Sequence, residues 1–382
     1  MSKSQKVIIS EKKKSPIIFS FFAGSGLLDL GFERTCFDVR FVNEFYKPFQ
    51  EAYRYSRSQM SMEEPLYGYH QGSIEDFLKD SEVAAQRLKR DVKTAKKESL
   101  VGFVGGPPCP DFSAGGKNRG REGDNGRLTE AFVQVLVKHK PDFFLIENVK
   151  GLWKTEKHRV FYQEMKDLLE KSGFTIFDRL TNSIEFGVPQ TRDRIFLFGI
   201  QKSLLNNKDI AFPWERYIRF DRKIINQKFL WPSATPYREN SILARPDFIT
   251  DDFVELTVEY WFEKNNVEFH PNAQHHFTPR QALVRFQTIE EGNVKGKSFK
   301  RLHRWRYSPT AAYGNNEVHL HPYKSRRLSA AEALAIQSLP KDFVLPPHMK
   351  LSDMFKTIGN GVPFLLSEGI AKSIFDFLNE AT

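Results

Sequence analysis

The sequence has only two cysteines, Cys36 and Cys109, among its 382 residues. Two thiols are too few for a disulfide framework or a cysteine-based zinc site, and this excludes the disulfide-rich secreted scaffolds. His275 and His276 are adjacent and lack a third ligand at helical spacing, so we expect no metal site. Scarce cysteine is typical of a reducing compartment, and we predict a cytoplasmic location. Cys36, beside Phe37, is interpreted as a structural thiol.

Long apolar runs are missing as well. No stretch approaches the roughly 20 apolar residues that a membrane-spanning helix needs, so we expect no membrane association. The lysines at 12–14 are followed only by a strand-length apolar run at 17–22 that leads into glycines, which argues against a signal peptide. The formal net charge of +10 indicates a polyanionic partner, and nucleic acid is the favoured one.

Short apolar runs recur with helix-like stretches between them, and this rhythm indicates an alternating α/β fold. The runs are nearly continuous and rich in β-branched and aromatic residues, as in strands covered by helices on both faces, so we expect parallel pairing. The charged stretch 79–98 is expected to be a solvated helix or an excursion between strands. The predicted strands are 17–22, 39–42, 101–104, 143–146, 174–177 and 195–200.

A change of pattern after residue 200 predicts a second, smaller domain. Residues 201–325 are irregular, rich in aromatics and prolines, and show no sustained helical period. Helical patterns return at 329–339 and at 362–378. The predicted organisation is a first domain at 1–200, a second at 201–325, and a return to the first at 326–382.

A glycine cluster follows the first predicted strand, at a strand-to-helix turn where a ligand can approach the backbone closely. Asp29 stands where a dinucleotide fingerprint has its third glycine, and the lysine of a P-loop is missing. Glu44 follows the second apolar run, where a carboxylate can accept hydrogen bonds from ribose hydroxyls. An adenosine-containing ligand fits both features, and so does a plain tight turn with a surface carboxylate. The candidate residues of the turn are Phe22, Ala23, Gly24, Ser25 and Gly26.

Cys109 follows an apolar strand in the segment GGPPCPDFS, at the carboxyl end of the sheet where open α/β folds build their sites. The neighbouring prolines fix the backbone and remove donors, so the loop presents one reactive thiol. We interpret Cys109 as functional, although a buried structural thiol is the commoner state of a lone cysteine. The stretch 114–126 is rich in glycine and charge, which indicates a closing loop or a solvated surface loop.

Two further clusters carry polar groups. Glu147 and Asn148 end the apolar run at 143–146, so we expect Glu147 near Cys109. A carboxyl partly desolvated there has a raised pKa and can donate a proton to a ring nitrogen, and helix capping is the alternative. Alternation along the next strand places Arg192 and Arg194 on one face, which indicates anion or carbonyl binding, or a surface salt-bridge pair.

The order of these motifs resembles the cytosine-5 DNA methyltransferases of bacterial restriction-modification systems. The resemblance rests on FAGSG, NE, GGPPCPDFS, ENVKGL, QTRDR, RRLSAAEALAIQSLP and IGNGVP, which stand in the family's order over both ends of the chain. It implies a Rossmann-like S-adenosylmethionine-dependent methyltransferase sheet with a smaller irregular target-recognition domain. It also implies methyl transfer from S-adenosylmethionine to carbon-5 of a flipped cytosine in double-stranded DNA, and a cognate restriction endonuclease encoded nearby.

The resemblance implies roles for single residues. Cys109 would be the nucleophile, Glu147 the contact to cytosine N3, and Arg192 the contact to its O2. Asn148 would position Pro108, and Arg194 would support this set. Departures from the family's pattern are Ser73 in place of an acidic residue near the adenine, Pro110 in place of glutamine, and Gly361 in place of serine. The implied cofactor pocket comprises Phe22, Gly24, Glu44, Phe45 near the adenine, Ile74, Leu128, Asn360 and Val362.

The densest basic run of the second domain, KGKSFKRLHRWR at 295–306, is predicted to contact DNA. Thr310 resembles a family threonine near the flipped base. Two alternative functions stay open, namely cytosine-5 methylation of transfer RNA and a catalytically silent DNA-binding regulator. Together with the loop after Cys109, the expected DNA contacts are Ser113, Lys117, Arg119, Arg121, Lys300, Arg301, Arg304, Arg306 and Thr310.

Overall fold

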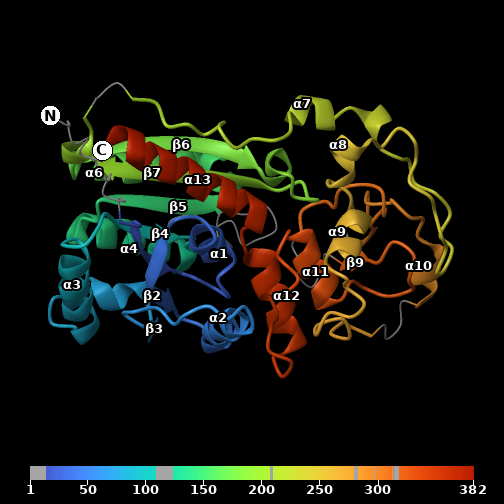
Figure 1. Cartoon of the computed structure of the whole chain (residues 1–382), viewed down its shortest axis with the longest axis horizontal. Coiled ribbons are helices and arrows are strands. Elements are labelled where there is room, and N and C mark those ends of the chain that lie inside the picture. Colours follow the sequence, from blue (N-terminus) through green and yellow to red (C-terminus); the bar gives the residue numbers. More distant parts are fainter. Residues whose placement is uncertain are drawn as a thin grey trace, which may run out of the picture.

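The computed structural model describes residues 14–108, 124–206, 210–278, 283–296, 298–311, 313 and 318–382. They form two lobes with helices α11 and α12 between them (Figure 1). The first lobe is a sheet covered by helices, and the second consists mainly of loops and short helices (Figure 1). The predicted α/β class is confirmed.

The sheet has seven strands in the order β3-β2-β1-β4-β5-β7-β6. Neighbours are parallel except at β7, which is antiparallel to β5 and β6. The expectation of parallel pairing was therefore wrong for β7, because the link between β6 and β7 is too short for a crossover of a dozen or more residues. The strands are β1 (Ile17–Phe21), β2 (Asp38–Glu44), β3 (Tyr69–Gln71), β4 (Val101–Gly105), β5 (Phe143–Val149), β6 (Phe174–Asn182) and β7 (Asp193–Gln201).

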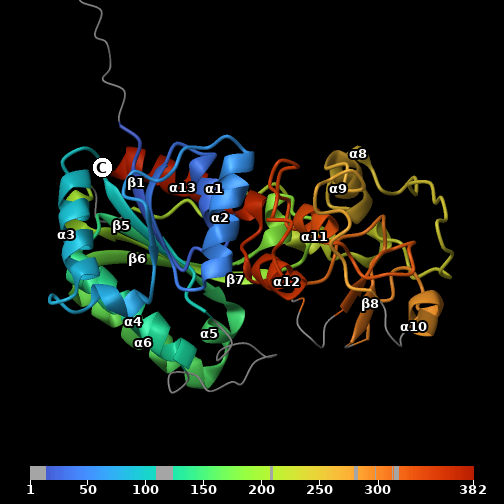
Figure 2. The ribbon, with the colours of Figure 1, turned by 90° about the horizontal axis from the view of Figure 1, so that it is seen from below.

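Helices cover both faces of the sheet (Figure 2). Alternate strand residues face opposite layers, so that Phe19 and Phe21 pack with α3, α4 and α6, whereas Ile18 and Val104 pack with α1 and α13. This double burial explains the near-continuous apolar runs. The helices of this lobe are α1 (Leu27–Glu33), α2 (Lys47–Gln59), η1 (Ile74–Phe77), α3 (Val83–Ala95), α4 (Asp124–His139), α5 (Lys150–Lys154), α6 (Glu156–Lys171), η3 (Ser183–Phe186) and α13 (Phe364–Ala381).

The second lobe has little regular structure, in agreement with its irregular sequence. Trp261 and Phe262 of α9 form a small core with Ile336 of α11. Phe212, which lies in the range predicted for the second domain, packs instead beside Phe198 and Phe377 of the first lobe. The elements are η4 (Lys202–Leu204), α7 (Arg222–Ile225), η5 (Lys228–Leu230), α8 (Asp251–Val254), α9 (Val258–Lys264), α10 (Leu283–Thr288), β8 (Phe299–Arg301) and β9 (Val318–Leu320).

Helices α11 (Ala330–Ile336) and α12 (Leu351–Asn360) connect the lobes. Ser329 and Glu332 form a capping box at the start of α11, because each side chain accepts a hydrogen bond from the other residue's backbone N–H. One side of α11 packs against the second lobe and the other against α1 and α2. The sequence predicted α11 and α13 but not α12.

The contact between α1 and α13 leaves no room for a side chain at Gly31. A Cβ there would lie 2.2 Å from Ser367 Oγ and 2.5 Å from the backbone nitrogen of Glu368. We expect Gly31→Ala to lower the free energy of unfolding by about 1–3 kcal/mol, because overpacking forces the two helices apart. Urea denaturation measures the change.

Ser373→Ala on α13 is the matched control. Its buried hydroxyl has no hydrogen-bond partner among the described residues, so removing it should be neutral or slightly stabilising. Equal losses for both variants would contradict the assignment of steric crowding to Gly31.

Candidate active site at the strand ends

The turn between β1 and α1 has an unusual backbone. Phe22, Gly24 and Gly26 have φ values of 52°, 58° and 82°, in the left-handed region that glycine adopts without strain. The N–H of Ala23 donates to the carbonyl of Asn43 at 3.1 Å, which fixes the turn against β2. At Gly24 an added Cβ would meet nothing nearer than Thr357 Oγ1 at 3.9 Å, so the backbone there is open to close approach at the carboxyl end of the sheet.

Glu44 is the last residue of β2, and its carboxylate binds the backbone of this turn. Its Oε2 accepts from the N–H of Gly24 and its Oε1 from the N–H of Tyr46, both at 2.8 Å. Burial raises the pKa of this carboxyl, and these backbone hydrogen bonds act in the opposite direction. The next side chain, Phe45, is 71 % exposed. A buried acceptor group therefore stands beside an exposed aromatic ring at the predicted cofactor turn.

The carboxyl-terminal part of the chain reaches the same turn. Ser25 Oγ and Thr357 Oγ1 of α12 are 2.7 Å apart and share a hydrogen bond. At the end of α12, Asn360 is exposed, and Val362 beyond it is buried. Thr357 was missed by sequence reasoning, although it immediately precedes the IGNGVP motif.

The remaining predicted cofactor residues lie along neighbouring elements. Ser73 caps η1, with its Oγ accepting from the N–H of Glu75 at 3.2 Å. The side chain of Ile74 is buried in the sheet core, and Leu128 of α4 packs against the same core. Pro108 is half-buried at the end of the described part of its loop.

Glu147 lies at the end of β5, and its carboxyl is buried. Arg194 Nε is 2.7 Å from Glu147 Oε1. Burial raises the pKa of Glu147, and the charges of Arg194 and Arg192 offset only part of that effect. A Cβ added to Gly106 would lie 2.8 Å from Glu147 Oε2, so the carboxyl rests against the backbone three residues before Cys109. A protonated carboxyl can donate a hydrogen bond here.

Several predicted residues lie outside the described part of the chain, namely Cys109, Pro110, Ser113, Lys117, Arg119 and Arg121. Asn148 is described, and its Oδ1 accepts from the N–H of Val149 at 2.8 Å. Its buried Nδ2 has no hydrogen-bond partner among the described residues, and its role in positioning Pro108 stays a prediction. Cys36 is exposed, contrary to its interpretation as a structural thiol.

Arg192 is 1 % exposed and joins distant segments of the chain. Its Nη1 donates to the carbonyl of Ala311 at 2.9 Å, and its Nη2 to that of Gly359 at 2.7 Å. These two bonds make Arg192 a structural clamp, and they do not support its predicted contact with cytosine O2. Arg194, expected only to support the site, is the arginine that touches Glu147.

Two glutamines that sequence reasoning missed extend this clamp. Gln190 Oε1 accepts from the N–H of Ala311 at 3.0 Å, and its Nε2 donates to Gln337 Oε1 at 3.1 Å. Gln337 donates in turn to the carbonyl of Ile358. Thr310 Oγ1 donates to the carbonyl of Thr191 at 2.8 Å. Gln190 stands within the QTRDR motif and Gln337 within RRLSAAEALAIQSLP, and these positions were the signals available from the sequence.

The predicted DNA-contacting run contains two arginines that are structural. Arg301 is fully buried; it donates to the carbonyls of Phe286, Ile289, His321 and Lys324, and its guanidinium lies 3.9 Å from the centroid of the Tyr237 ring.

Arg304 is buried as well, and it forms two 2.9 Å hydrogen bonds with Glu291. The prediction was wrong for both arginines, because their donors are used inside the lobe. Lys300 and Arg306 are half-buried.

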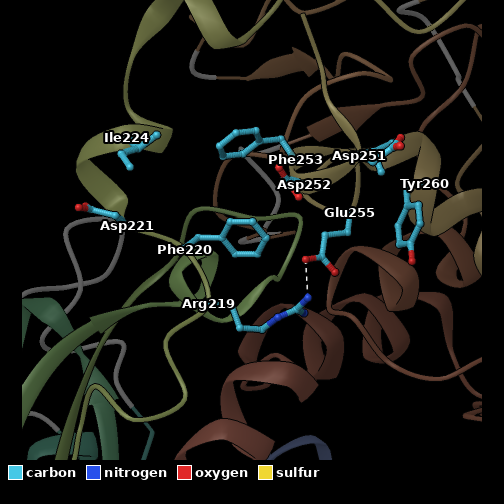
Figure 3. A pocket seen from close by; sticks show the side chains of 10 residues that line it. Arg219, Phe220, Asp221, Ile224, Asp251, Asp252, Phe253, Glu255 and Tyr260 are labelled. Atoms are coloured by element: carbon cyan, nitrogen blue, oxygen red, sulfur yellow. Dashed lines mark hydrogen bonds and ion pairs between the residues drawn. The ribbon is translucent and has the colours of Figure 1, made fainter.

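A groove open to solvent lies beside α7 and α8 in the second lobe (Figure 3). Asp221, Asp251 and Asp252 line it, and Arg219 forms an ion pair with Glu255 across it (Figure 3). None of the predicted site residues lines this groove, and its excess of carboxylates disfavours phosphate. In the described part of the chain, no helix is long and apolar enough to cross a membrane, and no three metal-ligating side chains gather.

The fold is shared with solved methyltransferase structures. A putative DNA modification methyltransferase encoded within an Escherichia coli prophage superposes with a TM-score of 0.63 at 22 % identity, covering 96 % of this chain and 99 % of that one. Spodoptera frugiperda DNMT2 superposes with a TM-score of 0.58 at 16 % identity, covering 94 % and 100 %. At these identities the likeness establishes the fold alone.

Sequence comparison shows the family. The sequence model of the C-5 cytosine-specific DNA methylases matches residues 17–376, and the chain belongs to this family. It is similar to the type II methyltransferase M.NmeDI of Neisseria meningitidis serogroup C, with 52 % identity over 97 % of this chain and 86 % of that protein. It is also similar to M.FnuDI of Fusobacterium nucleatum, with 28 % identity over 95 % of each.

The protein is therefore a DNA (cytosine-5-)-methyltransferase, as its motifs predicted. This decides against the two alternatives, an enzyme acting on transfer RNA and a catalytically silent regulator.

We expect Arg192→Met to lower the free energy of unfolding by about 2–4 kcal/mol, because it leaves the buried carbonyls of Ala311 and Gly359 without their donors. Chemical denaturation measures the loss. The nearby Arg222→Met is the control; its side chain is 39 % exposed and pairs with Asp193, so about 1 kcal/mol or less is expected. Similar losses for both variants would show that Arg192 is not a clamp.

Proposed function

We propose that this DNA methyltransferase transfers the methyl group of S-adenosylmethionine to carbon-5 of a cytosine flipped out of duplex DNA, as the modification enzyme of a type II restriction-modification system. A cognate endonuclease encoded nearby and a cytoplasmic location with the nucleoid belong to this proposal. The observation that carries it is the meeting of the glycine turn, Glu44 and Phe45 with the carboxyl of Glu147 at one edge of the sheet.

The residues at the turn fit S-adenosylmethionine. Gly24 leaves the backbone accessible, Glu44 offers a buried carboxylate to ribose hydroxyls, and the exposed ring of Phe45 offers a face to adenine. When bound, this cofactor supplies an electrophilic methyl group on a sulfonium. Further pocket residues are proposed to be Phe22, Ala23, Ser25, Gly26, Ser73, Ile74, Pro108, Leu128, Asn360 and Val362.

The chain's own groups activate the cytosine. The thiolate of Cys109 adds to C6, which makes C5 nucleophilic towards the methyl group. Once C5 carries the methyl group, its proton passes to water and the C6–sulfur bond breaks, which releases Cys109 as a thiolate. Burial raises the pKa of Glu147, which favours a carboxyl that donates a proton to N3 and balances the charge that develops on the ring. Arg194 contacts Glu147 and would orient its carboxyl, and this contact supports Arg194 as the arginine that contacts the base. Arg192 donates to the backbone carbonyls of Ala311 and Gly359, and Asn148 accepts from the N–H of Val149, so both side chains bind the backbone around the site.

The second lobe is proposed to recognise the target sequence, from residues near the predicted boundaries 201–325. Base flipping is required because the C6 face is hidden in a stacked duplex. Lys300, Arg306 and Thr310 remain proposed DNA contacts, together with Ser113, Lys117, Arg119 and Arg121 of the loop after Cys109.

The direct test is methyl transfer from labelled S-adenosylmethionine to duplex DNA, followed by sequencing of the product for 5-methylcytosine. We expect label at one sequence motif, and we expect Cys109→Ser to abolish it because a hydroxyl is a far weaker nucleophile than a thiolate. The control is Cys36→Ser, which makes the same change at an exposed thiol and should keep full activity. Full activity of Cys109→Ser would disprove the mechanism.

The raised pKa of Glu147 predicts a pH dependence. A proton donor is active below its pKa, so kcat/KM should fall as pH rises through the pKa of Glu147, which lies above the usual range for glutamate. Glu147→Gln should lower kcat/KM by about 100-fold or more, because an amide cannot transfer the proton. In Glu147→Gln, the fall of kcat/KM with rising pH that is assigned to Glu147 should also disappear.

Rates of methyl transfer measured across pH at saturating cofactor check both statements. DNA affinity of the variant, measured in parallel, controls for loss of binding. An alkaline decline that persists unchanged in Glu147→Gln would assign it to another group.

A further inference from the structure

A buried arginine outside every recognised motif holds the far side of the glycine turn. Arg57 lies in the last turn of α2 and is 3 % exposed. Its Nη2 donates to the carbonyl of Gly26 at 2.7 Å and lies 2.6 Å from Glu33 Oε2, while its Nε donates to Glu33 Oε1 at 3.2 Å. The guanidinium also lies over the Tyr53 ring, 4.2 Å from its centroid. Arg57 therefore connects α2 with both ends of α1.

The packing around Gly26 leaves no space for a side chain. A Cβ at this position would lie 2.6 Å from Arg57 Nη2 and from the ring of Tyr53, and the φ of 82° independently favours glycine. The carbonyl that Arg57 binds is the same one that accepts the first helical hydrogen bond of α1, from the N–H of Leu30. The orientation of the turn's last peptide thus depends on the position of the guanidinium.

The charges around Arg57 explain why an arginine stands there. Glu33 and Asp29 both face it, and Tyr53 donates to Glu33 at 3.2 Å. Asp29 accepts from Ser20 at 2.8 Å, and burial together with the negative charge of Glu33 raises its pKa to about 7. A guanidinium fork pairs with Glu33 while it donates to the Gly26 carbonyl, and the single ammonium of lysine does not reproduce that geometry.

We propose that Arg57 is a positioning residue that sets the affinity for the methyl donor by holding the glycine turn through the carbonyl of Gly26. This rests on the proposed S-adenosylmethionine site. The turn is fixed by Glu44 at Gly24, by Thr357 at Ser25 and by Arg57 at Gly26. Because α2 begins just after Phe45, the same contact fixes the proposed adenine-stacking ring relative to the turn.

The test is calorimetric binding of S-adenosylmethionine to the full-length wild type, Arg57→Lys and Arg54→Lys, followed by steady-state methylation of duplex DNA. Arg54→Lys is the matched control; it makes the same change on the same helix, at a side chain that is 55 % exposed. We expect Arg57→Lys to raise the Kd and the KM for S-adenosylmethionine about tenfold, the size seen when an outer partner of a binding group is lost. At saturating donor, kcat should stay within about twofold.

The outcomes separate this inference from the proposed function. A wild type that does not bind S-adenosylmethionine defeats the proposed function. A wild type that binds, with a folded Arg57→Lys variant of equal affinity, overturns the inference even if the melting temperature falls. If Arg57→Lys does not fold, the double variant Glu33→Gln/Arg57→Gln takes its place, because it removes both charges together. Weakened donor binding with unchanged DNA affinity supports the inference, and wild-type donor binding overturns it.

Discussion

The buried guanidinium of Arg192 is the contact on which the arrangement of the two lobes depends. A cation removed from water needs acceptors, and Arg192 finds them in the carbonyls of Ala311, from the second lobe, and Gly359, from α12. Gln190 and Gln337 extend the same network to the end of α11 and the end of α12. The second lobe and α12 are thereby joined at the start of β7, beside the carboxyl of Glu147.

The antiparallel direction of β7 explains why the first residues of this strand lie beside Glu147. In a parallel β7, its first residues would lie at the amino edge of the sheet, away from Gly106 and Glu147. Because β7 is antiparallel to β5, Arg194 pairs with Val149 at the carboxyl end of β5 and reaches Glu147 two residues earlier. A short connection between β6 and β7 therefore decides that Arg194 meets Glu147.

Buried charge has two different uses in this protein. At Glu147 the burial raises a carboxyl pKa beside an arginine, which suits proton donation. At Arg301 and Arg304, by contrast, burial serves only the packing of a lobe with few regular elements. Glu291 and several backbone carbonyls satisfy these arginines, so the donors of Arg301 and Arg304 are used inside the lobe. A high density of basic residues therefore did not distinguish the structural arginines from those that are free to contact a partner.

The sequence by itself determined the family, the α/β class, six of the seven strands and the location of the glycine turn, Glu44 and Glu147. These follow from local signals, because apolar periodicity and motif order are written in neighbouring residues. The tertiary structure alone decided the direction of β7, the clamp role of Arg192, the existence of α12, and the contact of Arg57 with Gly26. The roles of Arg192 and Arg57 depend on partners far apart in the chain, and one sequence does not specify which distant carbonyl or carboxylate a buried arginine will meet.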